Sequence, residues 1–187
     1  MVSSDKRLQL LKVSILIVFV VGIGFVLLRG IGVIGDSGGP TYVKMKENQN
    51  SALEDLKAKG AKCELKRYPQ GDAYSINLSG VPVTDEIFER VKEAAPVSEL
   101  FLSGSGVTDA HAAIINEPAV GGFLTKLDVS KSEFSDAGLA QLKSLNLLME
   151  LNVTGTKVTP EGINKFQESR IGNVNIMPML QRVTIKK

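Results

Sequence analysis

Apolar and polar residues alternate over four short segments of the chain, and the segments recur at a nearly constant spacing. The second apolar positions of the four segments are separated by 24, 27 and 24 residues, and they are Ile76, Leu100, Leu127 and Leu151. Alternation over a few residues predicts a strand with one buried face. The residue two places further on is again apolar in every segment: Leu78, Leu102, Val129 and Val153. We expect these eight side chains to stack in one core.

A second pattern follows each strand and predicts a short helix. Each segment continues with a hydroxyl residue followed by Asp or Pro, in the pairs Thr84-Asp85, Thr108-Asp109, Ser135-Asp136 and Thr159-Pro160. Ser and Thr are typical helix N-caps, and Asp and Pro favour the first helical turn. The helices that follow are expected to bury Phe88, Ala112, Leu139 and Ile163, and then Val91, Ile115, Leu142 and Phe166.

The phrase L-x-L-S-G-x-x-V-T-D in these segments resembles the leucine-rich repeats of the cysteine-containing, ribonuclease-inhibitor-like kind, especially short exported bacterial versions. The resemblance covers residues 73 to about 176 and implies an α/β leucine-rich-repeat solenoid of four to five repeats over residues 73–187. The fifth copy would run from Ile171, with Val174 as its reference. A helix from Ser51 to Gly60 and a strand from Cys63, within residues 48–72, would form the N-terminal cap, and the last seven residues would close the other end.

An uncharged run of sixteen residues from Val13 to Leu28 precedes the repeats. It predicts a transmembrane signal anchor, with the lipid bilayer as a partner of residues 13–28. Lys6, Arg7 and Lys12 precede the run and Arg29 alone follows it. This bias places residues 1–12 in the cytoplasm and predicts a single-pass cell-membrane protein whose C-terminal domain is extracytoplasmic, joined by a linker at residues 29–47. A cleaved signal peptide is the alternative, although no alanine for an Ala-x-Ala site occurs this early.

Charge and cysteine content narrow the class of partner. After Gly35 the chain has 18 Lys and Arg against 19 Asp and Glu, a balance of −1, so the basic excess lies in the N-terminal part. A nucleic-acid partner is therefore not expected, since it would need a basic face on the folded domain. The lone Cys63 excludes an intramolecular disulfide. We interpret it as a small buried residue in a strand, with an intermolecular disulfide or a reactive thiol as alternatives.

The stretch GDSGGP, residues 35 to 40, resembles the sequence around the nucleophilic serine of chymotrypsin-like proteases. Ser37 precedes the single histidine, His111, so a triad cannot form in that family's order. We interpret the stretch as a spacer. No HExxH, CxxC or GxxxxGKS pattern is present, so we expect no enzyme, no catalytic residue, no cofactor and no metal. A metal site is a further hypothesis for Asp85, Asp109 and Asp136, which are otherwise expected to lie in the helix caps and first turns.

The resemblance implies a scaffold for protein–protein interaction, because such repeats present strand residues on a concave sheet. Two columns of exposed strand positions are readable: Ser75, Glu99, Lys126 and Glu150 in one, and Asn77, Phe101, Asp128 and Asn152 in the other. The predicted binding residues for an unknown protein or peptide are Glu99, Phe101, Lys126, Asp128, Glu150 and Asn152. A structural envelope domain without a specific partner is the alternative, and a serine hydrolase that uses Ser37 is a further one.

Overall fold

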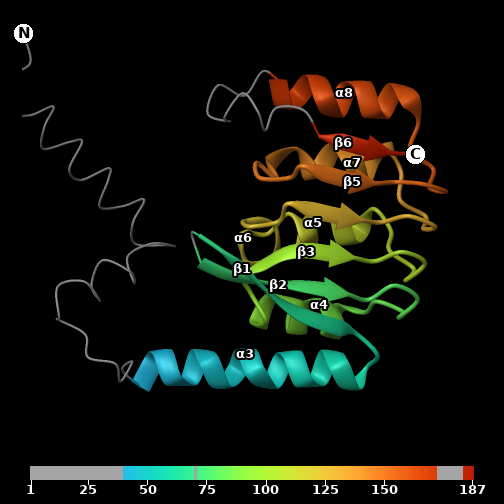
Figure 1. Ribbon diagram of the computed structural model, residues 1–187. Helices are drawn as coiled ribbons and strands as arrows, with labels where there is room; N and C mark the ends of the chain where they lie inside the picture. The colour runs from blue at the N-terminus through green and yellow to red at the C-terminus, as the bar shows by residue number, and fades with distance from the viewer. Residues whose placement is uncertain (1–39, 70, 172–182) are drawn as a thin grey trace, which may run out of the picture. The chain divides into compact units, whose positions relative to one another are not determined.

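The computed structural model describes residues 40–69, 71–171 and 183–187 (Figure 1). The chain divides into two compact units, residues 1–45 and 46–187, and the second contains the sheet. The elements in chain order are α3 (Pro40–Ala58), β1 (Lys62–Tyr68), β2 (Gly71–Asn77), α4 (Asp85–Glu93), β3 (Val97–Phe101), α5 (Ala110–Ile115), α6 (Pro118–Gly121), β4 (Lys126–Asp128), α7 (Asp136–Gln141), the 3-10 helix η1 (Leu142–Ser144), β5 (Glu150–Asn152), α8 (Pro160–Ile171) and β6 (Thr184–Lys186).

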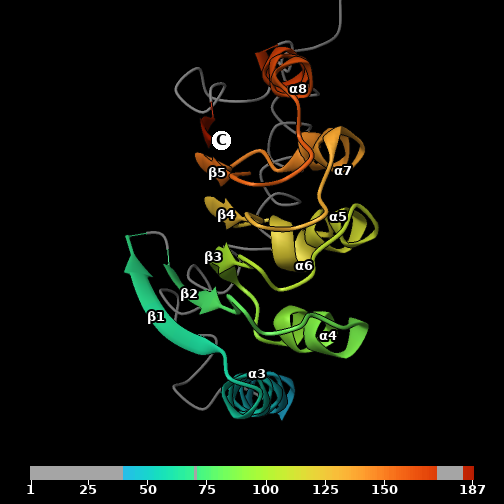
Figure 2. The same ribbon diagram turned by 90° about the vertical axis from the view of Figure 1, so that its right-hand side faces the viewer.

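The six strands form one sheet in chain order, with β1 antiparallel to β2 and the remaining neighbours parallel. Helices α4, α5, α7 and α8 lie on one side of this sheet, as Figure 2 shows with the sheet seen edge-on. The register predicted from the sequence is observed. Paired Cα positions run across the parallel strands through Ile76, Leu100, Leu127, Leu151 and finally Ile185.

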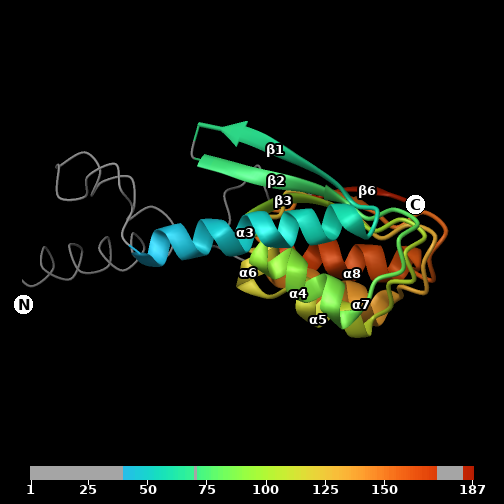
Figure 3. The ribbon, with the colours of Figure 1, turned by 90° about the horizontal axis from the view of Figure 1, so that it is seen from below.

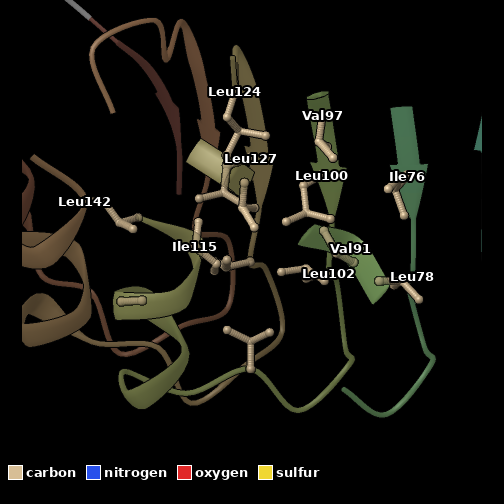
Figure 4. Close-up of a cluster of buried hydrophobic side chains, with 14 of the residues drawn as sticks. Ile76, Leu78, Val91, Val97, Leu100, Leu102, Ile115, Leu124, Leu127 and Leu142 are labelled. Carbon is tan, nitrogen blue, oxygen red and sulfur yellow. The ribbon is translucent and has the colours of Figure 1, made fainter. Parts of the chain in front are cut away.

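The core lies between the sheet and the helices. Ile76 and Leu100 are fully buried, and so are Leu78 and Leu102 two residues later (Figure 4). Their partners on the helices include Phe88, Val91, Ile115, Leu139 and Leu142, all fully buried. Burying one such side chain stabilises the fold by about 1.5–3 kcal/mol relative to leaving it exposed. The alternation in the strands therefore positions the opposite side chains, including Phe101, on the other face of the sheet.

Two of the predictions on the overall architecture need correction. The domain is a mixed α/β structure with a six-stranded, mostly parallel sheet, and not a closed leucine-rich-repeat solenoid. The spacing of apolar residues determines which side chains face the core, and an open sheet whose first strand turns back antiparallel satisfies that spacing equally well. The expected single-pass membrane localisation is also corrected, because no helix in the described ranges is long and apolar enough to span a bilayer. Residues 13–28 lie outside those ranges.

Helix α3 is longer than predicted and begins inside the expected linker. Pro40 stands at its start, a position that proline favours, and the helix ends before Gly60, whose φ is +98°. Its buried positions are Gln49, Ala52, Leu53 and Leu56, the spacing of one helix face. The predicted helix began at Ser51, so Gln49 lay outside it. Its side-chain Nε2 donates to the carbonyls of Ala95 at 2.6 Å and Ala94 at 3.3 Å.

The last strand also differs from the prediction. The expected fifth copy, with Val174 as reference, lies outside the described residues. The strand that pairs with β5 is β6, in which Ile185 occupies the position opposite Leu151. This strand belongs to the C-terminal segment that was expected to close the end of the domain.

Candidate functional site

The side of the sheet that faces away from α4, α5, α7 and α8, here called the exposed sheet face, carries two rows of side chains. In the first row, Lys126 lies between Glu99 and Glu150 on the neighbouring strands. Lys126 Nζ is 3.5 Å from Glu99 Oε1 and 3.6 Å from Glu150 Oε1. Lys126 therefore neutralises one of the two carboxylates, and the row of Glu99, Lys126 and Glu150 keeps a net charge of −1. Ion pairs near the surface contribute little to stability.

The second row lies where the strands end, and three of its members hold the turn that follows. Asn77 Oδ1 accepts from the backbone N–H of Ser79 at 2.9 Å. The same contact occurs between Asp128 Oδ1 and Ser130 N at 2.8 Å, and between Asn152 Oδ1 and Thr154 N at 3.1 Å. In addition, Asn152 Nδ2 donates to Asp128 Oδ2 at 2.9 Å. A side-chain oxygen at this position thus stabilises the turn two residues on.

Phe101 is the exception in this row. It pairs with Asn77 on one side and with Asp128 on the other, so it occupies the equivalent position of the second parallel strand. A phenyl ring offers no oxygen to the backbone two residues on, and Phe101 is outside the buried core, half-buried on the exposed sheet face. The fold alone therefore does not account for an aromatic residue here.

A shallow hollow of about 60 Å³ lies on this face next to Phe101. Its polar lining consists of Lys126, Asp128, Glu150, Asn152, Thr184 and Lys186. Five of the six predicted binding residues thus line one hollow, and Glu99 lies beside it through its ion pair with Lys126. Sequence reasoning missed Thr184 and Lys186. Val183 and Ile185 alternate with polar residues, which is the pattern of a strand with one buried face. The predicted fifth copy, with Val174 as its reference, lay upstream of this strand.

Two of the three carboxylates considered for a metal site have other partners. Asp109 accepts from the Ser135 backbone N–H at 2.7 Å and from its hydroxyl at 2.5 Å. Asp136 accepts from Thr159 in the same way, and these hydrogen bonds lower the pKa of Asp136. Asp85 lies in the first turn of α4 and is exposed. Within the described ranges, no group of three or more His, Cys, Asp or Glu side chains is arranged to hold a metal ion.

His111 and Cys63 do not line the hollow. His111 stacks on Phe88 with ring centroids 5.4 Å apart, and its Nδ1 accepts from the Thr108 backbone N–H at 3.0 Å. Cys63 is half-buried in β1, and its burial raises the pKa of the thiol, an effect that Lys57 partly opposes. Ser37 lies outside the described residues.

Comparison with known proteins gives the chain a structural neighbour. No family model and no curated protein matches the sequence. Among solved structures, the chain is similar to one described as Leiomodin-1 Actin-Binding Site 2 (ABS2), with 14% sequence identity and a TM-score of 0.46. The similarity covers 73% of this chain and 78% of that chain.

Proposed function

We propose that this domain is a protein-binding module that holds a peptide or protein segment on the exposed sheet face. The observation that carries the proposal is the position of Phe101. Asn77, Asp128 and Asn152 each hold the following turn from the equivalent position, and Phe101 gives up that hydrogen bond. A residue that breaks a local stabilising pattern without entering the core is expected at a functional site. Aromatic side chains are enriched at the centres of interfaces.

The surroundings of Phe101 supply the polar rim that an interface needs. Lys126 and Glu150 line the hollow beside it and form an ion pair with each other. Asp128 is likewise engaged by Ser130 and Asn152. The partner chemistry that fits is an apolar side chain against Phe101, flanked by groups that hydrogen-bond to this rim.

The alternative is a structural domain without a specific partner, and a photo-crosslinking experiment separates the two. A photoreactive phenylalanine analogue is placed at position 101 of the full chain, and a matched control carries it at Ala140, which is exposed in α7. Irradiation in the native cells should give a defined protein adduct from position 101 and none from position 140. Equal or absent labelling at the two positions would favour the structural domain.

The substitution Phe101→Asn sharpens this test, because it restores the side-chain oxygen found in the other three strands. A gained hydrogen bond contributes about 0.5–1.5 kcal/mol and offsets the lost ring contacts, so the free energy of unfolding should change by less than about 1 kcal/mol. Binding of the protein identified by crosslinking should nevertheless fall at least about tenfold. A variant that keeps full binding would show that the ring has no role in recognition.

A further inference from the structure

Strand β1 lies at one end of the sheet order, and in the described part of the chain it pairs only with β2. It is seven residues long, the same length as β2. In Figure 3, which views the domain from the α3 end, β1 and β2 lie above α3 in the view, whereas α4, α5 and α7 lie below it. An uncovered edge of this length is a template for another strand.

The hydrogen bonds of β2 show which backbone N–H and C=O groups of β1 point to the open edge. Tyr74, which stands opposite Leu65, donates its N–H to the carbonyl of Pro96 at 2.8 Å and therefore not to β1. In an antiparallel pair, residues of such a position direct both backbone groups away from their partner strand. The N–H and C=O of Leu65 thus point to the open edge, and so do those of Cys63 and Arg67, two residues to either side.

The opposite edge of the sheet shows what a covered edge looks like. Beside β6, the side-chain amide of Gln167 accepts from the backbone N–H of Val183 at 3.2 Å and donates to its carbonyl at 2.6 Å. A side chain there takes the place of a neighbouring strand. Among the described residues, no side chain makes such a hydrogen bond to the backbone of Cys63, Leu65 or Arg67.

The side chains of β1 are complementary to a second, antiparallel copy of the same strand. The side chain of Leu65 is exposed although it is apolar, with 45% of its surface accessible. Glu64 and Lys66 lie on the other face of the strand, 2.9 Å apart between Oε2 and Nζ. A two-fold axis at Leu65 brings the two leucines together and places each Glu64 opposite Lys66 of the second copy. Opposite charges in directly facing positions stabilise a strand pair, whereas like charges destabilise it.

We propose that β1 pairs with β1 of a second copy of this chain, antiparallel and centred on Leu65, so that two sheets become one. Alternate residues of both strands would exchange about six backbone hydrogen bonds. Neighbouring registers are disfavoured by charge, since an axis at Glu64 sets two glutamates face to face and an axis at Lys66 sets two lysines face to face. The two-fold axis is normal to the sheet, so the two exposed sheet faces lie on the same side of the dimer.

The register predicts a specific crosslink. In the dimer, Cys63 stands opposite Arg67 of the second copy, so the substitution Arg67→Cys places two thiols opposite each other. Within one strand the two positions are about 13 Å apart, and a disulfide needs Cα atoms within roughly 7 Å. A disulfide between positions 63 and 67 must therefore join two chains.

Mild oxidation of the full-length Arg67→Cys chain should give a covalent dimer, and mass spectrometry of its peptides should show position 63 linked to position 67. The matched control is Arg67→Cys combined with Cys63→Ala, which should stay monomeric on a non-reducing gel because the introduced thiols do not face each other. Absence of the 63–67 linkage in the first variant overturns the proposal, and so does an equal yield of covalent dimer in the control.

A charge-reversal series tests the same register independently of geometry. In the Arg67→Cys chain, Glu64→Lys sets lysines face to face and should reduce the rate of crosslinking about tenfold. Adding Lys66→Glu restores the opposite charges and should restore the rate. All variants should keep the same urea midpoint, since these side chains are exposed. Failure of the double reversal to recover crosslinking, with folding intact, would falsify the paired strands.

Discussion

The carboxylate of Asp136 accepts two hydrogen bonds from Thr159, one from the backbone N–H at 2.7 Å and one from the hydroxyl at 2.6 Å. Thr159 immediately precedes α8, and the carboxylate lies in the first turn of α7. A Cβ atom on Gly162 would overlap this carboxylate. The glycine therefore makes room for a contact that joins the beginnings of two consecutive helices.

The same arrangement occurs between Asp109, directly before α5, and Ser135, directly before α7. Asp109 accepts from the backbone and the hydroxyl of Ser135, and a Cβ atom on Gly138 would overlap Asp109. Gly138 and Gly162 each stand three residues after the hydroxyl residue, and His111 stands three residues after Thr108. There the His111 Nδ1 itself accepts from the Thr108 backbone N–H. The hydroxyl–Asp pattern thus holds successive helices together, a role that its local reading as an N-cap did not include.

Replacing Gly162 by Ala should destabilise the domain. Helix propensity alone predicts a gain of about 1 kcal/mol for this change in a helix. The overlap with Asp136 reverses the sign, and we expect a loss of about 1–3 kcal/mol, as for other overpacked sites. Urea unfolding of the full chain measures the effect. In the double variant Asp136→Ala/Gly162→Ala the loss caused by the alanine at position 162 should disappear. An unchanged penalty in that background would refute the contact.

Stability should depend on acid pH through Asp136. Hydrogen bonds from Thr159 lower the pKa of this carboxyl in the folded state below its ordinary value of about 3.9. A lowered folded pKa means that the contribution is complete above the ordinary value and is lost as the pH falls through the folded pKa. The difference in unfolding free energy between the wild type and Asp136→Asn should therefore be largest near neutrality and shrink as the pH falls below the ordinary value. A difference that grows on acidification contradicts the assignment.

Truncation of two neighbouring residues in β3 should cost different amounts of stability. Leu100 is fully buried and Phe101 lies on the exposed sheet face. Leu100→Ala should cost about 2–5 kcal/mol, the usual range for a large-to-small change in a core. Phe101→Ala should cost less than half as much, because its ring is only half-buried. Urea midpoints of the two variants decide the matter, and a larger loss at position 101 would mean that the strand faces are reversed.

Arg170 should be important for stability although it is charged. Its side chain is fully buried in the domain and donates to the carbonyls of Leu145 at 2.8 Å and Leu148 at 3.2 Å, with the guanidinium 5.6 Å from the centre of the Phe166 ring. Arg170→Met removes the guanidinium donor from the Leu148 carbonyl, whereas the Leu145 carbonyl still accepts from the Leu148 N–H at 3.1 Å. One buried carbonyl left without a partner costs about 1–3 kcal/mol. The exposed Lys165→Met is the matched control, and calorimetry of both should show a lower Tm for the first alone.

Several features of this protein follow from the sequence by itself. The repeating apolar positions identified the strands that contain Ile76, Leu100, Leu127 and Leu151, and their register agrees with the observed pairing. Periodicity is sufficient here because alternation places each side chain on one of two faces, and only one face is apolar. The same alternation predicts that Phe101 and the residues paired with it on the neighbouring strands lie on the exposed sheet face.

The tertiary structure decided the rest, because the remaining features depend on contacts between residues distant in the sequence. The burial of Gln49 requires the carbonyl of Ala95, 46 residues away, and no local pattern announces a buried polar group. The assignment of Leu65 to an open edge required the hydrogen bond between Tyr74 and Pro96. Whether the strands form a closed solenoid or an open sheet likewise depends on how whole strands pair with one another. Apolar spacing determines the inner face of each strand, but it does not determine which strand comes to lie beside it.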